Sequence, residues 1–373
     1  MGQVVKAPGP YGFFHFVPSP LPRTLDLNPT TVLALSRADT TLGRLAGAGR
    51  LLPNPHLLVE PYVAAEAVAS SRIEGTQASL NDLLEANATG RVPRGSDVRE
   101  VQNYIKAMHH GLNQLEKVPL CLRLLREVHG ILMKEVRGQE RQPGEFRTSP
   151  NWIGSPTDSL YDAAFVPPLP DEMGPLLNDL ERFINEDPPI PILVRCALIH
   201  YQFETIHPFL DGNGRLGRLL AVFYLVHQQV LPQPLLYLSA YFEKHRSQYY
   251  DRLQAVRERG ELQDWLQFFL TAVAEQASDA VWRSERLSDL REHYRREVST
   301  SRSRASEVVD MIIQNPFITI RQVQNNLGIT QPGALNLVRR LEKLGWLQQV
   351  GTVGRGGRTL WVAPEVLAVI GNR

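Results

Sequence analysis

The sequence has little cysteine, no long hydrophobic run and no excess of charge of either sign, and each absence excludes a class of protein. Its two cysteines, Cys121 and Cys196, lie in apolar helical patterns. We predict that both are buried core residues. A disulfide between them is possible but is not needed. No apolar stretch approaches the roughly 18 residues that a membrane span needs. With 40 basic and 39 acidic side chains, any attraction to nucleic acid or to a membrane must be local.

What is present is an ordinary globular composition, with 43% hydrophobic and 21% charged residues in 373, a length that fits two or three domains. The first residues lack the apolar run of a secretory signal, and Lys6 stands where a myristoylation motif needs Ser or Thr. We therefore expect a cytoplasmic protein without a membrane partner.

The most informative stretch runs from His207 to Arg218 and reads HPFLDGNGRLGR. Two glycines in DGNG allow backbone N–H groups to converge on an anion, and the buried helix that follows adds its N-terminus to the same site. Arg215 and Arg218 are three residues apart, so they share a helix face and can bind phosphate oxygens. Asp211 is a hard oxygen ligand suited to Mg²⁺ beside phosphates, and His207 can titrate near neutrality as a general base.

Each part of this stretch also has an ordinary structural explanation. A His-Pro pair usually marks a helix terminus, Gly-Asn-Gly is usually a turn, and two arginines on a helix usually face solvent. All of these features fall within twelve residues and in an order that makes one site. The combination therefore predicts a phosphate-binding site with a proton acceptor at its mouth.

The stretch resembles the signature of the Fic (filamentation induced by cAMP) family, His-x-Phe-x-(Asp/Glu)-Gly-Asn-(Gly/Lys)-Arg-x-x-Arg, at every specified position. The resemblance implies transfer of AMP from ATP to a protein hydroxyl. His207 would deprotonate the target Ser, Thr or Tyr, Asp211 would hold Mg²⁺, and Arg218 would bind the γ-phosphate. Gly214 is notable because the subgroup that phosphorylates its targets tends to carry Lys there. The nucleotide-binding residues implied in this segment are Gly212, Asn213, Gly214, Arg215, Leu216, Gly217 and Arg218.

A second informative stretch runs from Glu60 to Gly75 and reads as a helix. Pro61 fits its first turn and Gly75 fits the position just past its end. Glu74 then lies in the last turn, where a carboxylate opposes the helix dipole by about 0.3–1 kcal/mol. It is either an exposed side chain that tolerates this small cost or the partner of a cation.

Ser70-x-x-x-Glu74-Gly75 also resembles the inhibitory motif (Ser/Thr)-x-x-x-Glu-(Gly/Asn) of Fic proteins, in which the glutamate pairs with the second signature arginine. The resemblance implies that Glu74 binds Arg218 in place of the γ-phosphate. ATP could then bind only with its α-phosphate turned away from in-line attack. The motif precedes the signature, as in the class whose inhibitory helix is N-terminal.

Two further regions are candidates for nucleotide or target contacts. Residues 143–157 have turn residues around a short apolar patch, which predicts a β-hairpin or lid. The segment resembles the Fic flap that docks the target backbone and lines the nucleotide site, which implicates Ile153 and Gly154; a purely structural hairpin is the alternative. Tyr250 is a candidate adenine contact because the family places aromatic residues near it, although a Tyr-Tyr pair is by default a core pair.

The remaining pattern is mainly helical and predicts a mainly α fold: a Fic-type bundle with a hairpin flap. The proline-rich residues 1–30 read as an extended arm without regular pairing. Helices are expected near 79–88, 97–116, 120–136, 171–185, 191–205, 239–258 and 261–298, with Ser79 and Ser96 as N-caps. The predicted domains are a helical region at 31–115, which includes the inhibitory helix at 60–75, a catalytic domain at 116–273 and a connecting segment at 274–304.

Residues 305–373 predict a separate winged helix-turn-helix unit. Thr319 and Thr330 can cap its second and third helices, and residues 346–350 and 358–362 read as two strands. From residue 301 onward there are nine Lys/Arg and four Asp/Glu, so a modest basic face is expected. DNA binding and protein docking both remain open. The residues expected on this face are Gln331, Asn336, Arg339, Arg340, Arg355 and Arg358.

The reading that joins these features is a Mg²⁺- and ATP-dependent protein adenylyltransferase, held off by Glu74, that modifies a target protein and itself. One alternative is a DNA-binding regulator that uses the Fic domain as a nucleotide sensor, but pure binding would need no base at position 207. Another is removal of AMP from a modified protein, with Glu74 positioning a water. A homodimer is expected because such chains often pair.

Overall fold

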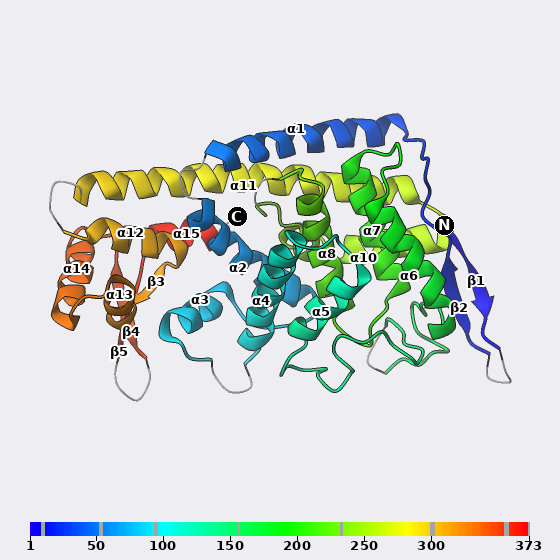
Figure 1. The fold of residues 1–373 in the computed structure, drawn as a ribbon, viewed down its shortest axis with the longest axis horizontal. Helices are drawn as coiled ribbons and strands as arrows, with labels where there is room; N and C mark the ends of the chain where they lie inside the picture. Colours follow the sequence, from blue (N-terminus) through cyan, green and yellow to red (C-terminus); the bar gives the residue numbers. More distant parts are fainter. Residues whose placement is uncertain are drawn as a thin grey trace.

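A computed structural model gives the fold, and it describes residues 1–8, 12–51, 55–92, 96–154, 157–231, 234–298, 303–353 and 358–371. The protein is mainly helical, as the sequence predicts. Figure 1 shows an elongated molecule in which α1 (Pro29–Leu51) and α11 (Leu262–Val298) lie side by side along one edge. The N-terminal strands lie at one end and the C-terminal unit at the other.

The prediction of an unpaired arm at residues 1–30 is wrong. β1 (Gly2–Lys6) and β2 (Phe14–Pro18) form an antiparallel hairpin, in which Gly2 pairs with Pro18 and Lys6 with Phe14. The prolines at 18, 20 and 22 lie at or after the end of β2, so they interrupt no central pairing. Phe16 is buried, and its N–H donates to the Val166 carbonyl at 2.9 Å.

The helical region begins with α2 (Pro55–Ile73), α3 (Leu80–Thr89) and α4 (Val98–Leu115). Pro61 lies inside α2 and not in its first turn, because the helix starts earlier than predicted. Gly75, two residues past the end of α2, has a φ of +92°, the left-handed conformation expected of a helix stop. Ser79 caps α3 in a capping box with Asp82, whereas α4 has Asp97 and not Ser96 at its N-cap.

The central bundle consists of α5 (Leu122–Leu132), α6 (Pro170–Asn185), α7 (Ile192–Ile206) and α8 (Asn213–His227). It is completed by α9 (Ser239–Lys244) and α10 (Arg246–Arg259), which replace the single helix expected at 239–258, and by α11. The expected flap hairpin is reduced to one bridge between Ile153 and Phe165, with prolines at 143 and 150 in the preceding loop. Residues 155 and 156 of the flap lie outside the described residues.

The C-terminal unit has the predicted order of elements, with two additions. α12 (Ala305–Gln314) precedes β3 (Phe317–Thr319), α13 (Ile320–Leu327), α14 (Gln331–Lys343), β4 (Gln348–Val353) and β5 (Arg358–Val362). Thr319 and Thr330 are the N-caps of α13 and α14, as predicted. β3 was not predicted; it pairs with β5 in a sheet of order β3-β5-β4, and α15 (Pro364–Gly371) returns the chain to α2 and α11.

The structure describes only part of the basic face expected on this unit. Arg339, Asn336 and Gln331 are exposed, but Arg340 is half-buried and donates to Ser303 Oγ at 2.8 Å. Arg355, the side chain of Arg358 and most of the linker at 299–304 lie outside the described structure.

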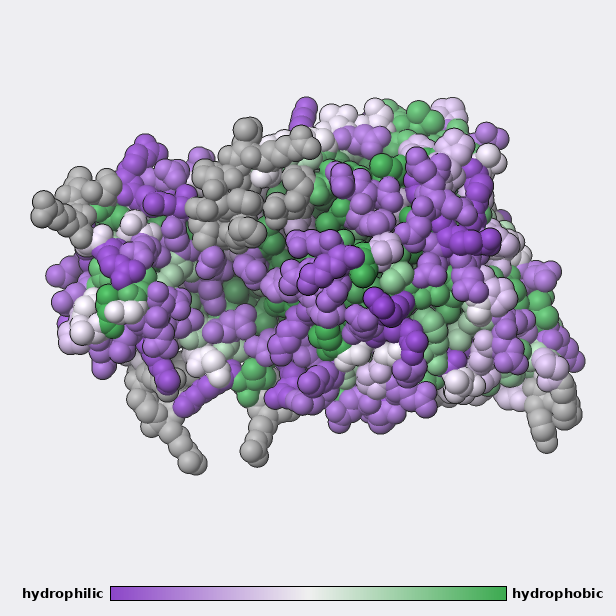
Figure 2. All heavy atoms as spheres, viewed as in Figure 1, coloured by the Kyte–Doolittle hydropathy of each residue, from purple (hydrophilic) through white to green (hydrophobic). Residues whose placement is uncertain are grey.

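The surface seen in Figure 2 is mostly hydrophilic, with hydrophobic residues in scattered groups. Within the part of the chain that the structure describes, no helix combines the length and apolar character needed to cross a membrane. Both cysteines are free; Cys196 is buried as predicted, whereas Cys121, at the N-cap of α5, is only half-buried.

Candidate functional site

The signature segment folds as a short loop between α7 and α8. α7 ends at Ile206, and His207 adopts the left-handed conformation with a φ of +50°. Gly212 follows with a φ of +77° and is the N-cap of α8. The Asn213 side chain accepts from the Phe209 N–H at 2.9 Å and donates to the Phe209 carbonyl at 2.8 Å. The loop is therefore closed on itself directly before a helix N-terminus, an arrangement suited to an anion.

Two arginines outside the signature, the buried Arg147 and the half-buried Arg257, hold this loop and the end of α7 in place. Arg147 Nε donates to the His207 carbonyl at 2.9 Å and Arg147 Nη2 to the Pro168 carbonyl at 2.6 Å, while the Arg147 N–H donates to Pro208 O. Arg257 donates to Thr205 Oγ1 and to the Glu204 carbonyl, both at 3.2 Å. Both cations thus bind the end of α7, where the helix dipole is negative.

These contacts also set the protonation state of His207. Burial and the guanidinium groups of Arg147 and Arg257 lower the pKa of His207 to about 3. The imidazole is therefore neutral at physiological pH and can accept a proton. Nearby, burial raises the pKa of Glu204 to about 7, and Glu204 Oε1 has no hydrogen-bond partner among the described residues.

His129 on α5 fixes the backbone at Asp211. His129 Nδ1 accepts from the Gly144 N–H at 2.8 Å, so its Nε2 carries the proton and donates to the Asp211 carbonyl at 2.9 Å. Burial lowers the pKa of His129 to about 4, and its ring stacks on Phe209 with centroids 3.8 Å apart. The Asp211 carboxylate is partly exposed and approaches Gly138, where an added Cβ would lie 2.6 Å from Oδ2.

The structure brings Ser70, Glu74 and Arg218 together, as the sequence predicts. Arg218 Nη2 donates to Glu74 Oε1 at 2.7 Å and to the Ser70 carbonyl at 2.9 Å, while its Nε donates to Ser70 Oγ at 2.8 Å. Arg218 is buried, with 2% of its side chain exposed, against 31% for Glu74. The end of α2 therefore supplies partners along one edge of the guanidinium group.

The electrostatics of this pair favour both charged forms. Burial by itself would raise the pKa of Glu74, but Arg218, Arg215 and His207 outweigh it, and the pKa is lowered. Burial likewise opposes the charge on Arg218, but Glu74 raises the pKa of Arg218 above its ordinary value. Glu74 Oε1 lies so close to Gly214 that a Cβ added there would overlap with it. The carboxylate therefore lies against the first turn of α8, where a phosphate would bind.

Arg215 has a carboxylate partner of its own that the sequence did not suggest. Its Nη1 lies 3.4 Å from Glu100 Oε2, and Glu100, on α4, is buried. The same Oε2 atom accepts from Thr76 Oγ1 at 3.0 Å. Glu100 thus connects Arg215 to the residue that follows Glu74-Gly75, and the turn after α2 is held by contacts on both sides.

Several polar atoms at the site lack a partner. Within the described ranges, Arg215 Nε and His207 Nδ1 are buried and make no hydrogen bond. Such atoms are costly unless a ligand or water satisfies them. The donor set fits a phosphate. Asp211 also fits Mg²⁺, which is commonly held by one or two carboxylates together with substrate phosphates. No group of three or more His, Cys, Asp or Glu that could hold a metal by itself occurs in the described part of the chain.

The remaining predicted residues are placed less favourably. Ile153 pairs with Phe165, and Gly154 packs against Asp158. The flap is joined to that loop by Arg147 and by Asn151, which donates to Phe209 O at 2.9 Å. Leu216 is buried in the core.

Gly217 packs against Glu204. Tyr250 is 40% exposed, and burial and the charge of Glu74 raise its pKa to about 12; its ring lies against Tyr249, with centroids 5.2 Å apart.

Sequence reasoning missed Glu100, His129, Arg147 and Arg257 as site residues. Their spacing in the sequence carries no signal, because they come from four separate segments. A charged residue in a helix is usually solvated, and only the tertiary packing of α4, α5, α10 and the flap brings these side chains to the signature segment. Arg147 lies within the segment 143–157 that was expected to form the flap, but nothing in that pattern predicts its bond to the His207 carbonyl.

The chain is similar to known proteins over the segment that contains this site. The profile described as Fic/DOC family N-terminal matches residues 32–113, and the profile described as Fic/DOC family matches residues 119–225. Together they cover about half of the chain. The protein adenylyltransferase Fic of Aedes aegypti is 29% identical over 172 residues, 45% of this chain and 31% of that protein. Its counterpart in Drosophila erecta is 27% identical over 203 residues, 52% of this chain and 37% of that protein.

Solved structures show the same fold. A Fic family protein from Desulfovibrio desulfuricans superposes with a TM-score of 0.59 at 19% identity, covering 91% of this chain and 97% of that one. A Fic domain containing signaling protein from Bacteroides thetaiotaomicron has a TM-score of 0.54 at 18% identity, covering 68% and 97%. The matched segments span only about a third of the curated relatives. Both profiles, the relatives and the fold agree, and the chain belongs to the Fic/DOC family.

Proposed function

We propose that this protein is a protein adenylyltransferase that transfers AMP from ATP to a hydroxyl group of a target protein, and that Glu74 inhibits it. The proposal rests on one observation. The neutral imidazole of His207, a closed loop at the N-terminus of α8 and two arginines converge on one site. The carboxylate of Glu74 pairs with one of these arginines, Arg218. The names of the relatives support this activity, since they are protein adenylyltransferases.

The reaction assigns a task to each group. The target hydroxyl oxygen attacks the α-phosphorus of ATP, the bond from that phosphorus to the bridging oxygen of the β-phosphate breaks, and diphosphate leaves. His207 Nε2 is the atom that would take the hydroxyl proton, because Nδ1 is buried. The N-terminus of α8 and Arg215 would bind the phosphates, Arg218 would bind the γ-phosphate, and Asp211 would hold Mg²⁺, which neutralises phosphate charge.

Glu74 would act by competing for Arg218. Since it binds the guanidinium at 2.7 Å and lies against Gly214, the γ-phosphate and Glu74 cannot both occupy this place. A displaced γ-phosphate would leave ATP bound with its α-phosphate turned out of line with the incoming hydroxyl. The contacts of Ser70 with Arg218 and of Thr76 with Glu100 support the inhibited position of Glu74.

Incubation of the purified full chain with Mg²⁺ and ATP, followed by intact-mass analysis of the chain and of added lysate proteins, tests the activity. Glu74→Gly is expected to add AMP, wild type much less, and Glu74→Gly combined with His207→Ala none. A mass increase of one phosphate would instead indicate phosphorylation. Loss of AMP from a modified protein with wild type but not with Glu74→Gly would indicate the reverse reaction. Silence of all variants would refute transferase activity.

The C-terminal unit gives a reason to keep a second function. Thr319, Arg321, Gln324, Gln331, Arg339 and Gln349 are among the residues that line a polar groove between α13, α14 and the sheet. Helix-turn-helix units present such a surface to DNA. Binding to duplex DNA that falls steeply with salt and is weakened by Arg339→Ala would support this role. It would stand beside the transferase activity and would not replace it.

A further inference from the structure

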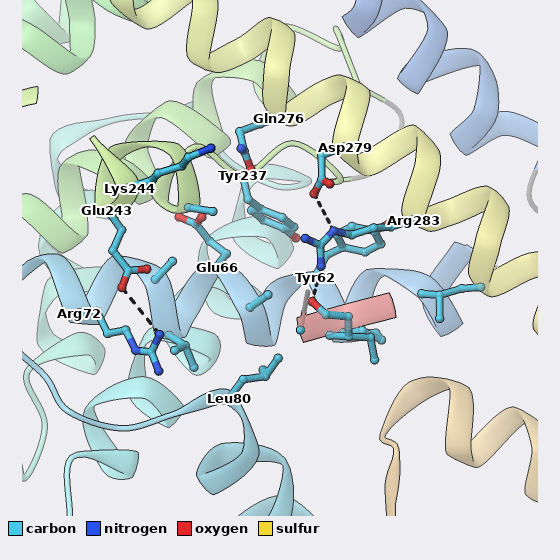
Figure 3. A pocket seen from close by; sticks show the side chains of 18 residues that line it. Tyr62, Glu66, Arg72, Leu80, Tyr237, Glu243, Lys244, Gln276, Asp279 and Arg283 are labelled. Atoms are coloured by element: carbon cyan, nitrogen blue, oxygen red, sulfur yellow. Dashed lines mark hydrogen bonds and ion pairs between the residues drawn. The ribbon is translucent and has the colours of Figure 1, made fainter. Parts of the chain in front are cut away.

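A cavity of about 450 Å³ lies beside α2 and is walled by α2, α9, α11 and α15. Its size is within the range of small-molecule sites, about 300–1,000 Å³. Figure 3 shows the side chains of Tyr62, Glu66 and Tyr237 gathered in this space, with Leu80 at one side. No step of the proposed reaction uses this cavity.

Two buried polar atoms at the cavity wall have no partner in the described structure. They are the hydroxyl of Tyr237, a residue only 7% exposed, and Oδ1 of Asp279. A buried hydroxyl or carboxylate oxygen without a hydrogen bond is costly, and such atoms in a native fold call for a water or a ligand. By contrast, the hydroxyl of Tyr62 donates to the Ala280 carbonyl at 3.0 Å.

Most of the charges around the cavity are paired with one another, and Lys244, which also lines it, is exposed to solvent. Arg283 Nε lies 2.6 Å from Asp279 Oδ2, and Arg283 also donates to the carbonyl groups of Val369 and Ile370 at the end of α15. Arg72 Nη1 lies 3.7 Å from Glu243 Oε1. A charged ligand would have to break such pairs, so the wall favours a neutral molecule.

Glu66 is the remaining acidic group at the wall, and it too is satisfied. It accepts from Tyr104 Oη at 2.9 Å and from the Ser239 N–H at 3.1 Å, and burial raises its pKa to about 7. The two free atoms therefore define the ligand. Asp279 Oδ1 needs a hydrogen-bond donor, and the Tyr237 hydroxyl can donate to an acceptor, a combination found in an alcohol or a primary amide.

We propose that this cavity binds a small neutral molecule with an apolar body and an alcohol or amide head, held by Tyr237 and Asp279. The site also touches the inhibitory helix directly. Ala65, Ala69 and Arg72 of α2 line the cavity, whereas Ser70 and Glu74 bind Arg218. A ligand that fits the cavity as it stands stabilises this position of α2, and therefore the Glu74–Arg218 contact. This second part rests on the proposed function of Glu74.

The test of binding uses four probes that share one body: 2-phenylethanol, phenylacetamide, phenylacetate and phenethylamine. Their dissociation constants are measured on the full chain by ligand-observed NMR and calorimetry. The alcohol or the amide is expected to bind at least tenfold more tightly than the anion and the cation. Failure of every probe to bind overturns the site, and equal or tighter binding of a charged probe overturns the neutral assignment.

Three variants locate the binding. Ala65→Leu places a larger side chain into the cavity and is expected to abolish binding, whereas Ala48→Leu, at a half-buried alanine of α1, should preserve it. Tyr237→Phe removes only the unpartnered hydroxyl. It should weaken the neutral probe about fivefold, the effect of one hydrogen bond, without lowering the melting temperature. Probe binding that all three variants leave intact places the site elsewhere and overturns the proposal.

The coupling has a separate readout. At a saturating neutral probe, the Kd of wild type for ATP is expected to rise at least threefold, whereas that of Glu74→Gly should not change. An unchanged wild-type Kd would refute the coupling and leave the site. If Glu74→Gly transfers no AMP at all, the proposed function fails, yet the probe affinities of the cavity variants still decide whether the site exists.

Discussion

Replacing Glu74 by glycine removes the carboxylate that holds Arg218 and should tighten ATP binding. The bond that disappears is a single charge-assisted contact of 2.7 Å. Arg218 keeps its two bonds to Ser70, so its position should persist. The released guanidinium group is then free to bind a phosphate oxygen.

The magnitude follows from the nature of that bond. A hydrogen bond to a charged group contributes about 1.5–3 kcal/mol, and about 1.4 kcal/mol corresponds to a tenfold change in a binding constant. Glu74 is 31% exposed, so solvent screening places the effect toward the lower end. The Kd for ATP should fall about 10- to 30-fold, and the rate of AMP transfer should rise because the γ-phosphate can take its productive place.

The assay is calorimetric titration of Mg²⁺-ATP into the two proteins, followed by label transfer under saturating ATP. Glu186→Gly is the matched control. Glu186 directly follows α6, and its side chain pairs with Arg23 at 2.8 Å; among the described residues it forms no hydrogen bond or ion pair with the signature loop. It should leave ATP binding unchanged. Equal ATP affinity in wild type and Glu74→Gly would refute the competition between Glu74 and the γ-phosphate.

Three further predictions follow from the same contacts. His207→Ala in the Glu74→Gly background should abolish transfer while changing the Kd for ATP less than threefold, measured by calorimetry; a large loss of affinity would contradict its role as a base. Gly214→Ala should displace Glu74, because the added Cβ overlaps with Oε1, so that the pairing of Arg218 is lost and a crystal structure shows Glu74 moved. Glu66 has a pKa of about 7 in the folded protein against an ordinary 4.5, so the folded state binds the extra proton and stability is lost as pH rises from about 4.5 to 7. Glu66→Gln should remove this pH dependence. Between pH 5 and pH 8, its free energy of unfolding, measured by denaturant unfolding, should gain on the order of 2–3 kcal/mol relative to that of wild type. The same pH dependence in both proteins would refute the raised pKa of Glu66.

The helix ends that were predicted correctly depend on local sequence signals, and the structure keeps these local interactions. Ser79, Thr319 and Thr330 cap their helices, and Gly75 ends α2, because these residues act on backbone groups within a few positions. The N-terminal hairpin was missed because its two strands are separated by a proline-containing loop and are stabilised by contact with Val166. The flap was expected to be a β-hairpin, but its described residues form a loop with a bridge between Ile153 and Phe165.

Sequence by itself determined the chemistry of the signature, because base, glycine loop and arginines lie within one loop and one helix turn. From the residues alone, Glu74 at a helix end could be either exposed or paired with a cation, and the resemblance to a family was needed to name Arg218. Only the tertiary structure decided that Glu100 pairs with Arg215 and that Arg147 supports His207. The reason is physical: local spacing fixes which side chains share a turn, whereas burial of charges from distant helices depends on how those helices pack.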